Sequence, residues 1–212
     1  MTFTPTARTT SLRSPDKLRY DKATAYRVLD EARVCHVGYI HEGTPRVLPT
    51  AHVRVGDFLY LHGSTGSRAL LSAKPDGLDV CVTATLLDGL VYSRSWFHHS
   101  VNYRCVMAHG RARPVIDDDE RWHALAALID TYGNGRSADS RDPSPKELAQ
   151  TGLLSLPLVE VSVRTRQGPP REDPDDMDLP FWAGEVPLST VPGDPIPDAD
   201  VEAAVPPYIP TS

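Results

Sequence analysis

A short polar loop stands between two apolar runs in the segment from Leu59 to Leu71. The first run ends at His62, and small and hydroxyl residues follow before Arg68 opens the second run. This order predicts a strand, a tight loop and a helix. Backbone N–H groups at a helix start, hydroxyls and a guanidinium together suit a phosphate group or another compact anion. Small residues between a strand and a helix are also common turn residues. Either use fits the loop pattern taken alone.

A second polar pattern lies between residues 97 and 115. Ser100, Asn102 and Arg104 alternate, so an extended backbone places them on one side. A buried arginine needs a partner, and this favours a binding role for that side over simple packing. His98 and His99 are consecutive and point in opposite directions on an extended chain, so they do not readily share one site.

The segment from Arg46 to Thr50 is expected to be a strand with an unusual edge. Pro49 has no N–H to donate, which predicts a free or bulged edge there. Vacant backbone N–H and C=O groups could then pair with the edge of a ring that displays donors and acceptors. The alternative interpretation places Val47 and Leu48 in the core, on whichever side of the strand faces inward.

The order of these segments resembles the pyridoxamine 5'-phosphate oxidase-like family of FMN-binding split barrels. Within it, the chain is most similar to the flavin-nucleotide-binding and nitroimidazole-resistance-like branch. The resemblance covers roughly residues 20–190. It is carried by the Gly-Ser-Arg loop that ends at Arg68, by the Ser-Val-Asn-Tyr-Arg turn that ends at Arg104, and by the Gly-Arg-Ala-Arg stretch that ends at Arg113.

The resemblance implies FMN in a groove where two subunits of a homodimer meet. Ser64, Ser67 and Arg68 would then hold the phosphate, and Ala69 stands where many family oxidases have a second basic residue. Arg46 or Arg104 would compensate for that difference. The implied cofactor-binding residues are Arg46, Val47, Leu48, Pro49, Thr50, His62, Gly63, Ser64, Ser67, Arg68, Asn102, Arg104 and Trp182.

Among these residues the resemblance also implies particular roles. The backbone of the segment Arg46–Thr50 would contact the flavin ring, and Asn102 and Arg104 would reach it from the neighbouring subunit. Trp182 would cover the flavin or seal the dimer. His62 lies close to the flavin in similar proteins and is the candidate catalytic residue. A histidine satisfied by the turn backbone is the alternative for His62.

The function expected from the resemblance is an FMN-dependent oxidoreductase. Reduced nicotinamide would supply electrons, and the acceptor would be a small, possibly nitro-aromatic molecule. A non-catalytic flavin carrier or sensor would have the same residues. A deazaflavin protein and a heme-binding split barrel are further alternatives, the latter with His52, His62 or His98 as axial ligand. Oxidation of pyridoxamine phosphate is not expected, because the chain after Arg171 has neither Arg nor Lys.

Composition excludes several other classes. The net charge is −6, and the chain from Thr165 onward has 2 of the 22 basic residues, 10 of the 28 acidic residues and 11 of the 20 prolines. A near-neutral body with an acidic tail argues against nucleic acid as a partner. We expect no membrane span, because no apolar run is long enough, and a cytoplasmic location, because the N-terminus lacks a leader pattern. Cys35, Cys81 and Cys105 fit buried free thiols, without zinc-type spacing.

The sequence lacks two patterns that are typical of other enzyme classes. Neither a nucleophile-elbow pattern nor a dinucleotide fingerprint of the parallel-sheet type is present.

Residues 1–14 are expected to be flexible, residues 15–165 to form the flavin domain, and residues 166–212 to form an acidic, proline-rich extension that packs on the barrel or on the dimer partner.

The elements predicted to position these residues are mostly strands. The predicted fold is mainly β, a six-stranded antiparallel split barrel with peripheral helices; strand content follows from the patterns and the split barrel from the resemblance. Asp21, Asp117 and Ser144 are the predicted helix starts, and Trp122, Leu125, Ala126 and Ile129 form the predicted core face of the second helix. Asp88-Gly89 is a predicted turn, and Lys74-Pro75-Asp76-Gly77 a predicted helix stop. The predicted strands span residues 34–40, 46–55, 58–62, 78–87, 90–95, 103–115 and 156–165.

Overall fold

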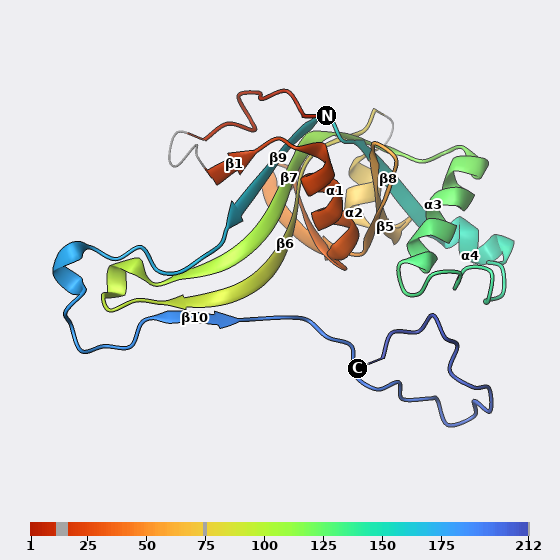
Figure 1. Ribbon diagram of the computed structural model, residues 1–212. Coiled ribbons are helices and arrows are strands. Elements are labelled where there is room, and N and C mark those ends of the chain that lie inside the picture. Colours follow the sequence, from red (N-terminus) through yellow and green to blue (C-terminus); the bar gives the residue numbers. More distant parts are fainter. Residues whose placement is uncertain (12–16, 74–75, 212) are drawn as a thin grey trace. The chain divides into compact units, whose positions relative to one another are not determined.

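The computed structural model describes residues 1–11, 17–73 and 76–211 (Figure 1). The predicted boundary at residues 14 and 15 and the predicted stop residues Lys74 and Pro75 lie outside these ranges. The chain divides into two compact units, each built from three segments. Unit 1 consists of residues 1–32, 82–109 and 159–189, and unit 2 of residues 33–81, 110–158 and 190–212.

The described residues form a mainly β fold with antiparallel pairing, which confirms the predicted class. Ten strands and four α-helices occur in these residues, where the sequence predicted six barrel strands. Hydrogen-bonded neighbours follow the order β3-β2-β6-β7-β8-β5-β4, while β1 pairs with β9, β9 with β7 and β10 with β6. None of the described helices is both long enough and apolar enough to cross a bilayer.

The elements of unit 1 and the two strands that continue from it into unit 2 are β1 (Leu18–Arg19), α1 (Lys22–Glu31), β6 (Leu78–Tyr92), η2 (Trp96–His98), β7 (Ser100–Pro114), β9 (Glu160–Arg166), η3 (Pro174–Asp176) and β10 (Gly184–Pro187). The elements that lie wholly in unit 2 are β2 (Cys35–His41), β3 (Thr44–Thr50), β4 (His52–Val55), β5 (Phe58–Ser64), α2 (Arg68–Ser72), α3 (Asp118–Asp130), α4 (Pro145–Gln150) and β8 (Thr151–Pro157).

Helix α1 begins where the sequence predicted. The Asp21 side chain accepts a hydrogen bond from the Thr24 backbone N–H (2.8 Å), as an N-cap does. The apolar face of α1 is buried, with Ala25, Val28 and Leu29 all at most 2% exposed. Near this helix start Phe3 is also buried, and its N–H donates to the carbonyl of Tyr20 (2.8 Å).

The predicted turn at Asp88-Gly89 is wrong, because β6 runs straight through it. Asp88 accepts two hydrogen bonds from Arg104, at 2.9 and 2.8 Å. Gly89 lies opposite Pro187 of β10, and a Cβ atom there would be 3.1 Å from the carbonyl oxygen of Val186. Asp88 therefore takes part in an ion pair, and Gly89 allows a close contact between two strands. The long curved β6 lies beside β10 (Figure 1).

Two other predicted strands are each divided in two. The segment 46–55 forms β3 and β4, because β3 pairs with β2 whereas β4 pairs with β5. The segment 156–165 contains the end of β8 and most of β9, separated where the N–H of Leu158 donates to the carbonyl of Asp57 (2.8 Å). In both places the chain changes its pairing partner while its residues stay strand-like.

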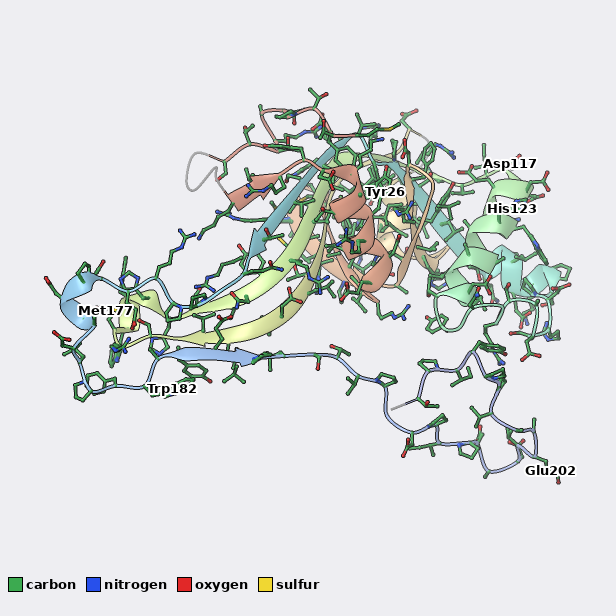
Figure 2. The ribbon with its side chains drawn as sticks, viewed as in Figure 1. Tyr26, Asp117, His123, Met177, Trp182 and Glu202 are labelled. Atoms are coloured by element: carbon green, nitrogen blue, oxygen red, sulfur yellow. The ribbon has the colours of Figure 1, made fainter. Side chains whose placement is uncertain are left out.

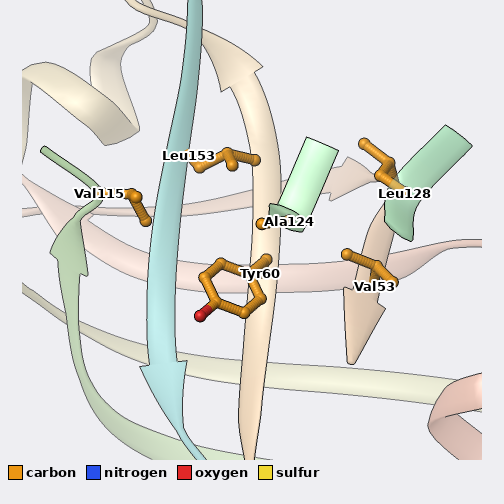
Figure 3. Packing of buried hydrophobic residues seen from close by; sticks show 6 residues of the cluster. All are labelled: Val53, Tyr60, Val115, Ala124, Leu128 and Leu153. Carbon is orange, nitrogen blue, oxygen red and sulfur yellow. The ribbon is translucent and has the colours of Figure 1, made fainter. Parts of the chain in front are cut away.

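The core of unit 2 packs α3 against strands (Figure 3). The buried cluster consists of Val53, Tyr60, Val115, Ala124, Leu128 and Leu153. Asp117 caps α3 as predicted, by accepting from the Glu120 N–H (2.7 Å). The Glu120 carboxylate does not complete a capping box; it accepts from the Tyr60 hydroxyl (2.9 Å) and from Arg113 (2.8 Å). Ser144 caps α4 as predicted, and it forms a capping box with Glu147.

Cys35, Cys81 and Cys105 are thiols that form no disulfide with the residues that the structure describes. Cys35 is fully buried, and burial raises its pKa to about 12. Cys81 and Cys105 are half-buried, and burial also raises the pKa of the Cys105 thiol. Only Cys35 therefore matches the predicted full burial.

Candidate functional site

Strand β3 exposes both of its faces. Every residue from Thr44 to Pro49 is exposed, including Val47 at 69% and Leu48 at 37%. The alternative that Val47 and Leu48 are core residues is therefore wrong. The register of β3 with β2 is continuous from Thr50 to Thr44, so Pro49 causes no bulge. Among the described strands β3 ends the sheet order, so its outer edge is free, as one of the two predicted alternatives required.

A hydrogen bond ties the end of β3 to the end of β5. The hydroxyl of Thr50 donates to the carbonyl oxygen of His62 (2.7 Å). The N–H of His62 in turn donates to the carbonyl of Ala51 (3.4 Å). These bonds bring the strand Arg46–Thr50 and the loop after His62 to one place in unit 2. The two segments that the sequence singled out as separate motifs therefore adjoin each other.

The loop after β5 keeps hydroxyl donors available. Ser64 Oγ accepts from the Gly66 N–H (3.3 Å), and Ser67 Oγ accepts from the Leu70 N–H (3.4 Å) as the N-cap of α2. A hydroxyl that accepts one bond still has its own hydrogen to donate. Thr65 instead donates toward the carbonyl of Gln150 (3.4 Å), which anchors the loop beside α4. Ser64 and Ser67 are thus held in position with O–H groups left for a ligand.

Two arginines of unit 2 near these segments are accessible to a ligand. Arg46 and Arg68 are both exposed. In the part of the chain that the structure describes, neither guanidinium takes part in a hydrogen bond or an ion pair. A guanidinium without an internal partner can fork onto two oxygens of a phosphate. The predicted phosphate contacts of Arg68 and Arg46 are thus chemically possible in this structure.

His62 lines a cavity of about 540 Å³ in unit 2. Its wall is largely apolar, because α3 contributes Trp122, Leu125 and Ile129 and α4 contributes Leu148. Desolvation lowers the pKa of the His62 imidazole. The ring is therefore neutral at physiological pH, which is the form that can ligate a metal or accept a proton.

The cavity wall corrects the predicted core face of α3. The buried residues of this helix are Ala124 and Leu128, whereas Trp122 and Ile129 are 42% and 38% exposed. The apolar stripe is real, and its residues Trp122, Leu125, Ala126 and Ile129 line the cavity. Of the predicted core residues, Leu125 also packs against the buried cluster. Periodicity marks an apolar face without telling whether protein or a ligand covers it. The sequence therefore did not predict the cavity, although it indicated both the apolar stripe and His62.

Charged residues close one side of this cavity. Arg141 donates to both carboxylate oxygens of Glu147, at 2.8 and 3.1 Å. Glu147 also accepts from the Ser144 N–H (2.7 Å). These hydrogen bonds, that from Arg141 first, lower the pKa of the Glu147 carboxyl to about 2. The pair is neutral as a whole and leaves the apolar wall as the dominant feature of the cavity.

In unit 1 the predicted flavin contact Arg104 is already occupied. Its guanidinium donates to Asp88 and also to both oxygens of Glu31, at 2.5 and 2.8 Å. These two carboxylates, Asp88 first, raise the pKa of the Arg104 guanidinium further. A flavin phosphate would have to displace one of them. Arg104 therefore fits a structural ion pair better than phosphate binding.

Asn102 and Trp182 also lie in unit 1, with partners of their own. Asn102 is buried, donates to Glu185 (2.6 Å) and accepts from Arg166. Trp182 is 65% exposed and its ring lies 5.5 Å from that of Tyr92 (Figure 2). Its exposed face is available to cover a ligand. The predicted site residues thus form one group around β3 and β5 in unit 2 and another in unit 1.

The three candidate heme ligands differ in their surroundings. His52 is buried on β4, and His98 on η2 pairs with Asp173 (3.1 Å). Of these three histidines, His62 is the one that lines the apolar cavity. A heme needs an imidazole that faces a large apolar space. His62 meets that requirement.

The chain thus combines an antiparallel β fold, a free edge strand and a cavity that His62 lines. Comparison with known proteins places the chain in a family. The family model described as pyridoxamine 5'-phosphate oxidase matches residues 21–165. The chain belongs to this family, and its fold is the split barrel. A search of curated protein sequences found no match.

Three solved structures are similar to this chain. The flavocytochrome Anf3 from Azotobacter vinelandii is 34% identical over 98% of this chain and 97% of its own, with a TM-score of 0.91. An FAD- and heme-binding protein from Mycobacterium smegmatis is 35% identical over 91% of this chain and 95% of its own, with a TM-score of 0.84. A candidate 5-nitroimidazole antibiotic resistance protein from Bacteroides thetaiotaomicron is 24% identical over 69% and 84%, with a TM-score of 0.58, and shares the fold.

Proposed function

We propose that this chain is a flavin-binding redox protein that also holds a heme. The observation that carries the proposal is the similarity, over nearly the whole chain, to a flavocytochrome and to an FAD- and heme-binding protein. The likeness, at 34% and 35% identity, also covers 97% and 95% of those two proteins. The residues of unit 2 give a separate test of whether such cofactors fit.

The free edge of β3 and the loop after β5 fit a flavin. Arg46 and Arg68 offer guanidinium groups, and Ser64 and Ser67 offer hydroxyl donors held by local hydrogen bonds. The exposed backbone of β3 supplies N–H and C=O groups for a ring edge. The sequence predicts FMN. The relative from Mycobacterium smegmatis favours FAD instead, because it is described as an FAD- and heme-binding protein.

The cavity lined by His62 fits a heme. Its volume of about 540 Å³ lies within the usual range of cofactor sites, and its wall is mostly apolar. The neutral imidazole of His62 would hold the iron, and Trp122, Leu125 and Ile129 would keep water from the macrocycle. When bound, flavin and heme would supply hydride and single-electron chemistry, while the chain supplies binding and orientation.

The proposal includes a homodimer, reduced nicotinamide as electron donor and a small acceptor. The exposed apolar side chains of β3, Val47 and Leu48, support a second subunit or a cofactor on that strand. A small nitro-aromatic acceptor remains an expectation from the sequence resemblance. A carrier or sensor would bind the same cofactors without turnover.

The test is the cofactor content of the purified protein. Its visible spectrum is recorded as purified and after anaerobic addition of NADPH or NADH, and the released flavin is identified by chromatography. We expect flavin bands and a Soret band together, with bleaching of the flavin bands by the nicotinamide. Bands that do not bleach would favour the carrier or another donor.

Variants assign the cofactors to their sites. His62→Ala should remove or shift the Soret band, whereas His123→Ala, on α3 but outside the cavity wall, should leave it unchanged. Arg68→Gln should lower flavin affinity by about tenfold or more, because a charged hydrogen-bond partner is lost. A protein that binds neither added flavin nor added hemin would refute the proposed function.

A further inference from the structure

Unit 1 has a second cavity of very different character. It measures about 380 Å³ and is lined mostly by polar and basic groups. Lys17, Arg19, Arg166 and Arg171 all border it, and none of its described lining residues is acidic. The chain as a whole carries a net charge of −6. Four cations around one concave surface therefore make this region positive, unlike the chain as a whole, and such a surface attracts anions.

The arginine on β9 is held in a fixed orientation. Arg166 donates to the Asn102 side chain and to the carbonyls of Gly168 (2.7 Å) and Pro169 (3.0 Å). These partners are neutral, so they position the guanidinium without cancelling its charge. An oriented cation loses less conformational entropy when it binds an anion than a mobile one.

The two carboxylates that follow Arg171 in the sequence pair with other groups. Glu172 follows Arg171 directly, but its carboxylate accepts from Arg94 and from the Ser93 hydroxyl (2.9 Å). Asp173 pairs with His98 (3.1 Å), which also borders the cavity. Among the described residues, Lys17 and Arg171 have no hydrogen bond or ion pair of their own. The two are therefore the cations most available to a ligand.

An aromatic ring completes the cavity. Phe97 of η2 borders it and is 84% exposed. An exposed ring beside a cationic surface is suited to stack on a planar base. Arginine side chains fork onto phosphate oxygens, and lysine adds a point charge. Together these groups match a base joined to two phosphates.

We propose that this basic cavity binds the adenosine diphosphate part of a dinucleotide. Its four cations would neutralise the pyrophosphate, and Phe97 would stack on the adenine. The dinucleotide would be either the flavin cofactor or the nicotinamide reductant, and this choice rests on the proposed function. Binding of an adenosine diphosphate group does not depend on that choice.

The first test is calorimetric titration of the protein loaded with FMN, using ADP, inorganic pyrophosphate and adenosine. We expect ADP and pyrophosphate to bind, with affinity that falls as salt rises, and adenosine to bind far more weakly. The double variant Lys17→Gln/Arg171→Gln should weaken ADP binding by about tenfold or more, because two charge-assisted contacts are lost. Phe97→Ala should weaken ADP binding while leaving pyrophosphate binding unchanged.

A matched control carries the same change in net charge. Arg27 of α1 and Lys146 of α4 are exposed and border neither cavity. Arg27→Gln/Lys146→Gln should leave ADP affinity unchanged. If the wild-type protein loaded with FMN binds no ADP, or if the Lys17→Gln/Arg171→Gln variant in the same form binds it as well as the control does, the proposal is overturned.

Competition distinguishes the two sources of the ligand. If FAD occupies the cavity, protein loaded with FAD will not bind ADP, whereas protein loaded with FMN will. If the nicotinamide reductant occupies it, ADP will bind to both forms, and the Lys17→Gln/Arg171→Gln variant will show a raised KM for the reductant with unchanged flavin content. ADP binding by a protein that holds neither flavin nor heme would support this site and refute the proposed function.

Discussion

The ring of Tyr208 rests directly on Gly133. A Cβ atom on Gly133 would lie 2.6 Å from Cδ2 of Tyr208 and 3.1 Å from its carbonyl oxygen. The Tyr208 hydroxyl donates to Asp139 and accepts from Arg136 (3.3 Å). The C-terminal tail is thereby fixed to the loop after α3. That loop contributes Ser137 to the cavity that His62 lines.

Gly133→Ala should therefore release the tail from unit 2. The added methyl group cannot fit without moving Tyr208, and overpacking of this kind costs about 1–3 kcal/mol. Limited proteolysis should cut residues 190–211 faster in the variant, and its midpoint of unfolding should fall. Gly193→Ala is the control, because nothing lies within 4 Å of a Cβ atom at that position. An unchanged digestion pattern in Gly133→Ala would contradict the contact.

In the protein without bound heme, His62 should make stability depend on pH. Its native pKa lies below the unfolded value of about 6.5. The unfolded chain then binds more protons as the pH falls through 6.5, so the free energy of unfolding decreases there and levels off below the native pKa. His62→Gln should flatten this part of the profile in urea unfolding between about pH 8 and pH 5.

The profile of a second variant separates His62 from other histidines. Desolvation also lowers the pKa of His109, so the wild-type profile contains more than one contribution. The informative quantity is the difference between wild type and His62→Gln across the pH range. In a His109→Gln background, His62→Gln should flatten the profile to the same degree. A constant difference for His62→Gln would show that the cavity does not perturb this imidazole.

Arg104→Gln should destabilise the native state at neutral pH. Asp88 and Glu31 would lose their common cation, and after allowance for partial exposure we expect a loss of about 1–2 kcal/mol. The hydrogen bonds from Arg104 lower the pKa of the Glu31 carboxyl. That contribution is present above the unfolded pKa and is lost as the pH falls through the lower native value.

The loss in Arg104→Gln should consequently shrink toward pH 3. Urea unfolding at neutral and acid pH measures it. In the background of Glu31→Gln, the same arginine substitution should cost less, because one of its two carboxylate partners is already neutral. Equal losses in both backgrounds would mean that the Arg104–Glu31 contact contributes nothing.

Leu153→Ala should test the core of unit 2. Leu153 is 1% exposed and packs in the cluster with Tyr60 and Leu128. Loss of a buried leucine side chain costs about 2–5 kcal/mol. Leu71→Ala, at a 55% exposed position of α2, should cost less than about 0.5 kcal/mol. Urea denaturation with an unchanged m-value would attribute the difference to stability.

Local signals predicted the elements whose determinants lie within a few residues. Asp21, Asp117 and Ser144 cap helices because an N-cap needs only its own side chain and the next turn. The turn predicted at Asp88-Gly89 is wrong because the residues that determine the local conformation, Arg104 and Val186, lie far away in the sequence. Strand β10 was not predicted, since the acidic, proline-rich tail has no alternating apolar pattern of its own.

The candidate site was predicted in part. The loop after β5 and the strand β3 were both singled out, and the structure joins them through Thr50 and His62. The predicted role of Arg104 did not take account of Asp88 on β6 and Glu31 on α1, because both are distant in sequence and reach Arg104 only in the folded chain. The apolar cavity and the basic cavity were not predicted, because a concave surface is made by elements distant in sequence.

The free edge of β3 has a built-in protection against aggregation. Pro45 and Pro49 both lie within this strand and have no N–H to donate. A proline in a paired strand places its nitrogen away from the neighbouring strand, and positions four apart share one edge. The outer edge therefore lacks two donors that a foreign strand would need for a regular ladder. A flavin ring needs only a few groups there, so β3 can remain open to a small ligand while it resists growth into an intermolecular sheet.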